Sequence, residues 1–184
     1  DLSAFDLSKE SAQVRESYGE DRFGQGVLLA RRLVERQVRF VEVQLGGWDT
    51  HQNNFSRVPE QGAILDQALS ALLADLEQRG MLEETLVVLA TEFGRTPNIN
   101  VNDGRDHYPK AFSCMLAGGG IKGGQVWGET DQEGREVIDQ KVEIPDLNAT
   151  IAFTLGLPLD EIVYSPTRRP FTLSDKGRPI TQLI

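Results

Sequence analysis

The chain has 184 residues, with 19 lysines and arginines against 28 aspartates and glutamates, so its formal net charge is −9. This balance excludes a nucleic-acid binder that relies on bulk positive charge, because phosphate contacts need clustered lysine and arginine. Hydrophobic residues make up 39% and charged residues 26%, which predicts one folded α/β domain over residues 1–184, and no apolar run approaches the roughly 18 residues of a membrane span.

The first third of the chain is predicted to be mainly helical. Ser8 can cap a short helix that ends at Gly19, and Asp21 can cap a second helix that runs to about Arg36. The apolar residues of the second helix lie on one stripe, which is typical of a helix packed against a core.

A strand and a long helix are expected next. Residues 39–45 alternate apolar and polar side chains, which indicates a strand. Pro59 is well placed to begin a helix that runs to about Arg79, where apolar residues repeat at helical spacing until Gly80 ends it.

The second half supplies further strands. Residues 85–90 form a continuous apolar run, which is typical of a strand covered on both faces in a parallel sheet, and residues 112–117 form another strand in which Cys114 is expected to be inert core packing. Asp146 can cap a last helix that Gly156 closes, and residues 171–184 could form a terminal hairpin. We therefore predict a three-layer α/β/α sandwich with a mainly parallel sheet.

The first chemically suggestive segment is Gly46-Gly47-Trp48-Asp49-Thr50-His51, directly after the expected strand. In open α/β sheets, ligands bind beyond the carboxyl ends of the strands. A carboxylate and an imidazole two residues apart can reach one metal ion, so Asp49 and His51 are candidate ligands. The alternative is that Asp49 caps a turn and His51 is a solvated loop residue.

The second segment, residues 91–97, follows the apolar run 85–90 and contains Glu92 and Arg95. A carboxylate that leaves a buried strand is costly unless it is paired or bound to a cation, so Glu92 needs a partner. Arg95 is one candidate partner, in an ion pair that fixes the loop, and a metal ion is the other.

The third segment, residues 104–109, contains Arg105, Asp106 and His107, the second of only two histidines. Together with Asp49, His51 and Glu92, the residues Asp106 and His107 would give nitrogen and oxygen ligands suited to a zinc-like or manganese-like divalent ion. Arg95 and Arg105 could hold a sulfate or phosphate group beside it, or they could form surface ion pairs in an acidic chain.

These three segments, together with Tyr18-Gly19 and Phe23-Gly24-Gln25, resemble those of an uncharacterised bacterial family, a domain of unknown function. Its members are often labelled sulfatases and placed in the alkaline-phosphatase superfamily. The resemblance covers nearly the whole chain, from about Asp6 to Ile180.

The resemblance implies an alkaline-phosphatase-like fold, of which this chain would be the C-terminal portion, in an exported periplasmic or extracellular protein. It also implies that Asp49, His51 and His107 hold one metal ion. The catalytic nucleophile and part of a second metal site would come from a preceding half. Phe93 stands where the superfamily has a histidine ligand, and phenylalanine cannot bind a metal.

The leading expectation is metal-assisted hydrolysis of a sulfate or phosphate ester, on a small molecule or a glycan, with Arg95 or Arg105 holding the anion. The fragment alone is expected to be inactive because it lacks the nucleophile. The alternative is a non-catalytic protein that keeps one metal or an ion-pair network and binds glycans or a partner. In either case Asp49, His51 and His107 should converge.

Overall fold

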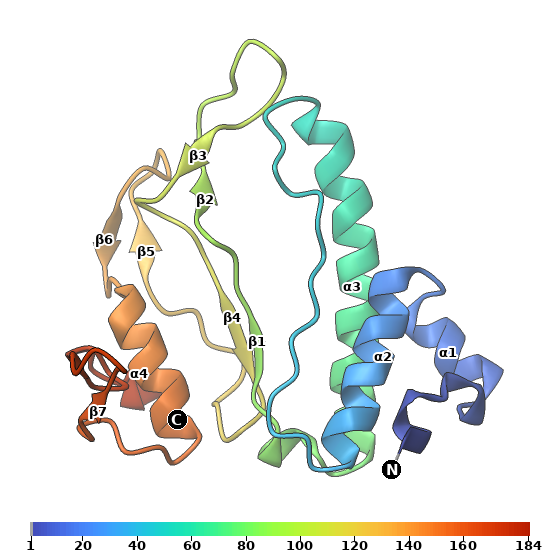
Figure 1. Cartoon of the computed structure of the whole chain (residues 1–184). Coiled ribbons are helices and arrows are strands. Elements are labelled where there is room, and N and C mark those ends of the chain that lie inside the picture. Colours follow the sequence, from blue (N-terminus) through green and yellow to red (C-terminus); the bar gives the residue numbers. More distant parts are fainter. Residues whose placement is uncertain (1) are drawn as a thin grey trace. The chain divides into compact units, whose positions relative to one another are not determined.

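The structure is a computed structural model that describes residues 2–184, and it contains two compact units (Figure 1). Unit 1 comprises the chain up to Met81 together with residues 98–106. Unit 2 comprises residues 82–97 and 107–184. The chain therefore passes from unit 2 into unit 1 and back between residues 97 and 107.

Unit 1 is helical. Its three α-helices pack on one another, and two 3-10 helices precede them: Leu2–Phe5, Leu7–Lys9, α1 (Ala12–Tyr18), α2 (Arg22–Glu35) and α3 (Asn54–Gln78). Asp21 caps α2 as predicted, because its carboxylate accepts hydrogen bonds from the amides of Phe23 and Gly24. Ser11, rather than the predicted Ser8, caps α1.

The long helix α3 begins before the predicted Pro59, which lies inside it. Its start is fixed by one contact with a distant residue and one with a near neighbour. The amide of Asn54 donates to the carbonyl of Asp103 over 2.9 Å, and the buried hydroxyl of Thr50 donates to the Asn54 carboxamide over 2.7 Å. Proline favours a helix start but does not require one, and here these two hydrogen bonds set the boundary.

The apolar core of unit 1 lies between its three helices. Tyr18, Val27, Leu28 and Ala68 are almost completely buried there, and half-buried residues such as Val43 pack against them. Leu28 and Ala68 have no exposed surface, which places the contact of α2 with α3 at the centre of the unit.

A charged cluster lies beside this core. The Arg31 side chain has no exposed surface, and its guanidinium forms ion pairs with Glu10 at 3.0 Å, Glu35 at 2.7 Å and Asp75 at 2.8 Å. The Tyr18 hydroxyl also donates to Asp75 over 2.9 Å. A buried arginine is rare unless it is paired, and here three carboxylates surround it.

Residues 39–45, predicted as a strand, are not part of any sheet in the described chain. The burial of the segment nevertheless follows the predicted alternation, with Val41, Val43 and Leu45 half-buried and Glu42 and Gln44 exposed. The side-chain pattern of a strand is therefore present without the hydrogen-bonded partner that defines one.

Unit 2 contains four two-stranded sheets, a helix and two 3-10 helices. Each sheet is antiparallel, with β1 paired to β4, β2 to β3, β5 to β6 and β7 to β8. The elements are the 3-10 helix Leu82–Glu84, β1 (Val87–Leu89), β2 (Gly94–Arg95), β3 (His107–Tyr108), β4 (Met115–Ala117), β5 (Glu129–Thr130), β6 (Val137–Asp139), α4 (Ile144–Thr154), β7 (Val163–Tyr164), β8 (Pro170–Phe171) and the 3-10 helix Thr181–Leu183.

The predicted fold, an alkaline-phosphatase-like three-layer α/β/α sandwich with a mainly parallel sheet, is therefore wrong. Parallel neighbours need a long crossover, usually a helix, and in residues 2–184 no helix lies between β1 and β4. The two strands run antiparallel, with Val88 opposite Leu116. Val88 is also 39% exposed, so the apolar run 85–90 is not covered on both faces.

The last helix and the hairpin differ from the prediction in their details. Glu143 is the N-cap of α4, and Asp146 completes a capping box from the third helical position. The C-terminal hairpin is made by β7 and β8, ahead of the predicted residues 171–184. The prediction that Asp146 belongs to the helix start is nevertheless correct, because a capping box uses the carboxylates of both Glu143 and Asp146.

Candidate metal centre

Two loops of unit 1, residues 46–53 and 98–106, are joined by backbone hydrogen bonds. The amide of Arg105 donates to the carbonyl of Thr50 over 3.0 Å, and the amide of Asn53 donates to the carbonyl of Asn102 over 3.3 Å. With the bond from Asn54 to Asp103 described above, these contacts hold the segment around His51 against the segment before His107.

Gly104 allows the two loops to approach closely. A Cβ atom on this residue would lie 2.0 Å from the carbonyl oxygen of His51 and 2.6 Å from the amide nitrogen of Gln52. Real Cβ atoms essentially never come within 3.0 Å of such atoms. A residue without a side chain is therefore required at this position.

The imidazole of His51 lies between two carboxylates. Its Nε2 is 3.1 Å from Asp49 Oδ1, and its Nδ1 is 2.7 Å from Asp106 Oδ1. The side chain of Asn100 donates to Asp106 Oδ1 over 3.0 Å and to the carbonyl of His51 over 3.1 Å. Asp106 and Asn100 therefore orient the ring, so that the opposite nitrogen faces Asp49.

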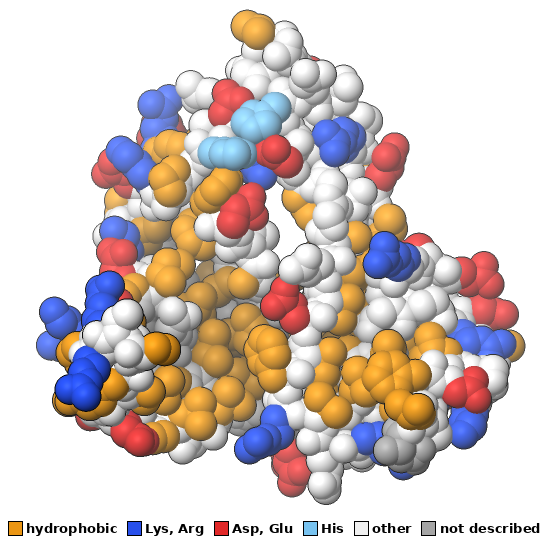
Figure 2. Space-filling model, in the orientation of Figure 1, with side chains coloured by type: hydrophobic (Ala, Val, Ile, Leu, Met, Phe, Trp, Pro, Cys, Tyr) orange, Lys and Arg blue, Asp and Glu red, His pale blue; other side chains and the backbone are white. Residues whose placement is uncertain are grey.

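His107 follows Asp106 directly in the chain. One ligand atom each from Asp49, His51 and His107 lie within 4.8 Å of one another, which is a possible metal-binding triad. Figure 2 shows both histidine side chains at the molecular surface. The predicted convergence of these three residues is thus present, and metal binding by them stays a prediction.

Within unit 2, His107 lies on β3 opposite Arg95 of β2. Its ring packs against the ring of Phe93 in a tilted arrangement, with centroids 4.4 Å apart and planes 47° from parallel. The Arg95 guanidinium lies over the Phe93 ring, 5.6 Å from its centroid. Phe93 cannot bind a metal, but it supports the His107 ring and the Arg95 side chain.

Glu92, which the sequence also predicted as a metal ligand, is not one of the three residues of the triad. Its side chain is 57% exposed and pairs with Arg95, whose Nη2 lies 3.1 Å from Glu92 Oε1. Arg95 is therefore the partner of Glu92 that the sequence gives as the alternative to a metal ion. Arg105 lies in unit 1 with its guanidinium 5.6 Å above the ring of Phe55 on α3.

Asn100 is the residue of this region that the sequence did not reveal. Its side-chain oxygen accepts hydrogen bonds from the amides of Asn102 and Gly104, while its nitrogen donates to both His51 and Asp106. The available signal was an Asn-x-Asn-Asp-Gly turn sequence, which predicts a turn but not the histidine that the turn supports.

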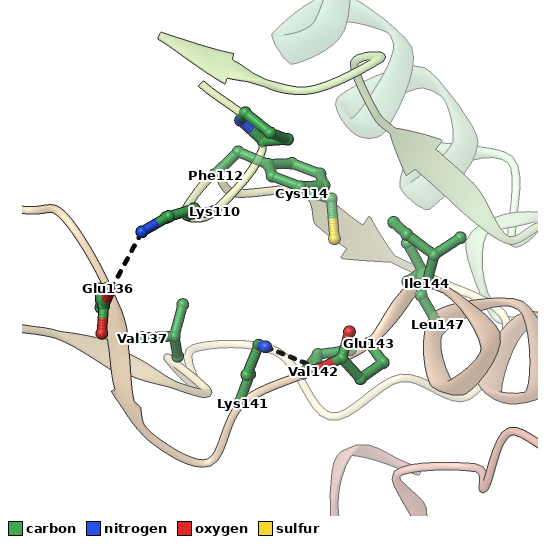
Figure 3. A pocket seen from close by; sticks show the side chains of 11 residues that line it. Lys110, Phe112, Cys114, Glu136, Val137, Lys141, Val142, Glu143, Ile144 and Leu147 are labelled. Atoms are coloured by element: carbon green, nitrogen blue, oxygen red, sulfur yellow. Dashed lines mark hydrogen bonds and ion pairs between the residues drawn. The ribbon is translucent and has the colours of Figure 1, made fainter. Parts of the chain in front are cut away.

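Unit 2 also contains a pocket of about 420 Å³ that the sequence did not indicate (Figure 3). Its rim carries two ion pairs, Lys110 with Glu136 at 3.2 Å and Lys141 with Glu143 at 2.7 Å. Cys114 lines this pocket and is exposed, so the prediction that it packs in the core is wrong. The residue is exposed, but its neighbours partly shield the sulfur from water, and this partial burial raises the pKa of the Cys114 thiol.

Comparison with known proteins places the chain in one family. The model of the family described as "Protein of unknown function (DUF1501)" matches residues 2–184. No curated protein and no solved structure matches the chain, and none of the helices in residues 2–184 combines the length and the apolar character needed to cross a membrane. Because the family match spans nearly all of the sequence, the chain belongs to the family of unknown function DUF1501.

Proposed function

We propose that Asp49, His51 and His107 bind a divalent metal ion of the zinc or manganese type and that this ion assists the hydrolysis of a sulfate or phosphate ester. The observation that carries the proposal is the grouping of the three ligand atoms within 4.8 Å. Two imidazoles and a carboxylate are a donor set that zinc accepts, and an open position would remain for a substrate.

The surroundings of His51 support this assignment. Ligating histidines usually donate their other ring nitrogen to a carboxylate, which fixes the ring and its tautomer. Asp106 is in that position, 2.7 Å from His51 Nδ1. We therefore assign Asp106 an orienting role rather than the ligand role predicted from the sequence, and we propose no ligand role for Glu92.

Arg95 is proposed to hold the anionic group of the substrate. It lies opposite His107 in the β2–β3 pair, and a guanidinium matches the oxygens of sulfate and phosphate. Glu92 is its present partner and is largely exposed, so an incoming anion would displace a pair that contributes little stability. A bound metal would polarise the ester oxygen.

The nucleophile is proposed to lie outside residues 1–184. Thr50 sits between two of the ligands, but its hydroxyl is buried and donates to Asn54. Cys114 has a raised thiol pKa, whereas a nucleophilic cysteine needs a lowered one. The chain by itself is therefore expected to turn over no ester, and the resemblance to proteins labelled sulfatases supports an exported enzyme that acts on a small anionic ester or a glycan.

A second candidate function is a non-catalytic protein in which the metal stabilises the loops and a glycan or partner protein binds. The observation that favours it is the ion pair between Arg95 and Glu92 at 3.1 Å, because this pair already occupies the guanidinium that would hold the substrate anion. Phe93 favours it as well, because it removes a ligand from the second metal site that the resemblance implies. The two candidates differ in whether the metal-loaded chain binds inorganic anions.

Metal binding is the first test. The chain is expected to bind Zn²⁺ or Mn²⁺ with one ion per molecule in a calorimetric titration, and the double variant His51→Ala, His107→Ala should lose at least about tenfold in affinity. Acidification should also weaken binding, because histidine must be unprotonated to ligate. Asp103→Asn is the matched control, since it removes an exposed carboxylate from the same loop at a left-handed position that asparagine tolerates.

Anion binding then separates the two functions. The metal-loaded chain is expected to bind inorganic sulfate or phosphate, and Arg95→Gln should weaken this binding while Arg22→Gln, an exposed arginine of α2, leaves it unchanged. Metal binding without any anion binding would favour the non-catalytic candidate. Equal Zn²⁺ and Mn²⁺ affinities of the wild type and the double histidine variant would refute both.

A further inference from the structure

Asn100 lies in the loop 98–106 of unit 1, and its side chain is held at four points within that unit. The side-chain oxygen accepts hydrogen bonds from the amides of Asn102 over 2.9 Å and Gly104 over 3.0 Å. The side-chain nitrogen donates to the carbonyl of His51 over 3.1 Å and to Asp106 Oδ1 over 3.0 Å. A carboxamide has two donor hydrogens and two acceptor lone pairs, so its full hydrogen-bonding capacity is used.

These four bonds permit one orientation of the carboxamide. Backbone amides only donate, whereas the carbonyl of His51 and the carboxylate of Asp106 only accept, so exchanging the oxygen and nitrogen of Asn100 would lose all four bonds. The carboxamide is therefore a fixed link between the turn at residues 100–104 and the two groups to which it donates.

Both of these groups set the position of the same imidazole. One is the main chain of His51 itself, and the other is the carboxylate oxygen of Asp106 that lies 2.7 Å from His51 Nδ1. The same oxygen atom thus contacts both Asn100 and the ring. Asn100 fixes this carboxylate relative to the backbone that carries the ring.

This arrangement favours one tautomer of His51. A neutral imidazole carries one proton, and the hydrogen bond that the ring makes decides which nitrogen carries it. Asp106 lies 2.7 Å from Nδ1, whereas Asp49 lies 3.1 Å from Nε2, and Asp106 is also held by Asn100. The proton therefore belongs on Nδ1, and the lone pair of Nε2 is directed toward Asp49.

The separation of His51 Nε2 and Asp49 Oδ1 fits two ligands of one ion. Zinc binds histidine nitrogen and carboxylate oxygen at about 2.0–2.2 Å in tetrahedral geometry, which places two such ligand atoms roughly 3.3–3.5 Å apart. The observed separation of 3.1 Å is close to this value.

We propose that Asn100 is a positioning residue that, through Asp106, holds His51 in the Nδ1–H tautomer and so makes Nε2 its metal-binding atom. The metal-binding part rests on the function proposed above, whereas the tautomer is a property of the chain without metal. An imidazole whose other nitrogen donates to a carboxylate is also a more basic ligand. The role of Asn100 therefore extends beyond the turn that its oxygen stabilises.

Nitrogen NMR of the imidazole side chains in the full, metal-free chain at mildly alkaline pH measures the tautomer. The chain has two histidines, so a His107→Ala chain assigns the signals of His51. The wild type is expected to show His51 as Nδ1–H, whereas Asn100→Ala should show both tautomers. Asn102→Ala is the matched control and should keep the wild-type tautomer, because Asn102 is exposed and enters the turn through its backbone.

A second variant, Asn100→Asp, separates the positioning role from the turn. Its side chain can still accept from the amides of Asn102 and Gly104, but it has lost both donors and repels Asp106. The expected result is a retained fold by circular dichroism with both tautomers of His51 populated. Because the new carboxylate would itself attract a cation, only the tautomer is measured in this variant.

Zn²⁺ titration tests whether Asn100 acts through Asp106. Asn100→Ala and Asp106→Ala should each lower the affinity by at least about tenfold. The double variant should lose little more than Asp106→Ala alone, because residues that act through one another are not additive. Asn102→Ala should bind Zn²⁺ like the wild type.

The outcomes distinguish this positioning role from the proposed function. The role is overturned if wild-type His51 carries its proton on Nε2 or populates both tautomers, if Asn100→Asp keeps the wild-type tautomer, or if the Zn²⁺ losses of the two alanine variants simply add. A wild-type chain that shows the expected tautomer and binds no Zn²⁺ would refute the metal centre, while the positioning of His51 by Asn100 would be supported.

Discussion

Replacing Arg31 by alanine is expected to lower the free energy of unfolding by about 3–5 kcal/mol, out of a total of about 5–15 kcal/mol for a domain of ordinary stability. The guanidinium is buried between Glu10, Glu35 and Asp75 at distances of 2.7 to 3.0 Å. Removing it leaves three carboxylates that are largely shielded from water with only two arginines, Arg32 beside Glu10 and Arg79 beside Glu35 and Asp75. The penalty of the unbalanced negative charge adds to that of a simple cavity. Urea unfolding at neutral pH measures the loss.

The pH dependence of stability should change in the same variant. Burial by itself raises the pKa values of Glu10 and Asp75, but hydrogen bonds from Arg32 and Arg79 and the nearby charge of Arg31 lower both below their usual 4.5 and 3.8. Such groups stabilise the fold above their unfolded pKa values, and the contribution is lost as pH falls through the lower folded values. The wild type should therefore lose stability below about pH 4.5.

In Arg31→Ala this acid-induced loss should be smaller, because protonation of Glu10 and Asp75 then relieves an uncompensated charge. The matched control is Arg22→Met, which changes an exposed arginine at the start of the same helix and should alter stability by no more than about 0.5 kcal/mol. If Arg31→Ala and Arg22→Met unfold at the same urea concentration, the buried cluster does not contribute as the geometry indicates.

Gly104→Ala is expected to separate the two loops of the candidate metal centre. The new Cβ would stand 2.0 Å from the carbonyl oxygen of His51, and neither a Cβ nor a backbone oxygen can move away by side-chain rotation. Overpacking costs about 1–3 kcal/mol even where side chains can adjust, so we expect a loss at the upper end of this range. Zn²⁺ affinity should also fall by at least about tenfold, since the hydrogen bonds that orient His51 are lost.

Gly46→Ala is the control for this prediction. Gly46 lies in the other of the two joined loops, and a Cβ there meets no atom within 4 Å. Its melting temperature and Zn²⁺ affinity should match those of the wild type. A Gly104→Ala chain that melts like Gly46→Ala would show that the loops do not approach as closely as the structure places them.

What the sequence could predict was local. Asp21 was identified as a helix cap because its carboxylate bonds to amides two and three residues further on, so all the information lies within one turn. Asp49 and His51 were identified for the same reason, since their spacing needs no other part of the chain. His107 is predicted because both histidines of the chain lie in acidic, glycine-flanked loops next to expected strand ends.

What the sequence could not predict depended on distant partners. The alternation of residues 39–45 gave the correct inward face, but whether a strand pairs, and in which direction, is decided by segments that the pattern does not contain. The same limit explains why the apolar run 85–90 predicts a parallel strand although β1 is antiparallel to β4. The burial of Arg31 was hidden as well, because an arginine next to Arg32 normally indicates a solvated helix face.

The bond between His51 and Asp106 joins residues 55 positions apart. Bringing such distant segments together has an entropic cost that must be met before the site exists. A metal that binds only the closed arrangement acts as a clip on this ring of chain, and it shifts the unfolding equilibrium by about 2.7 kcal/mol when its concentration is a hundred times its dissociation constant. Withdrawing the proposed ion would then make unit 1 easier to unfold, in addition to emptying the candidate site.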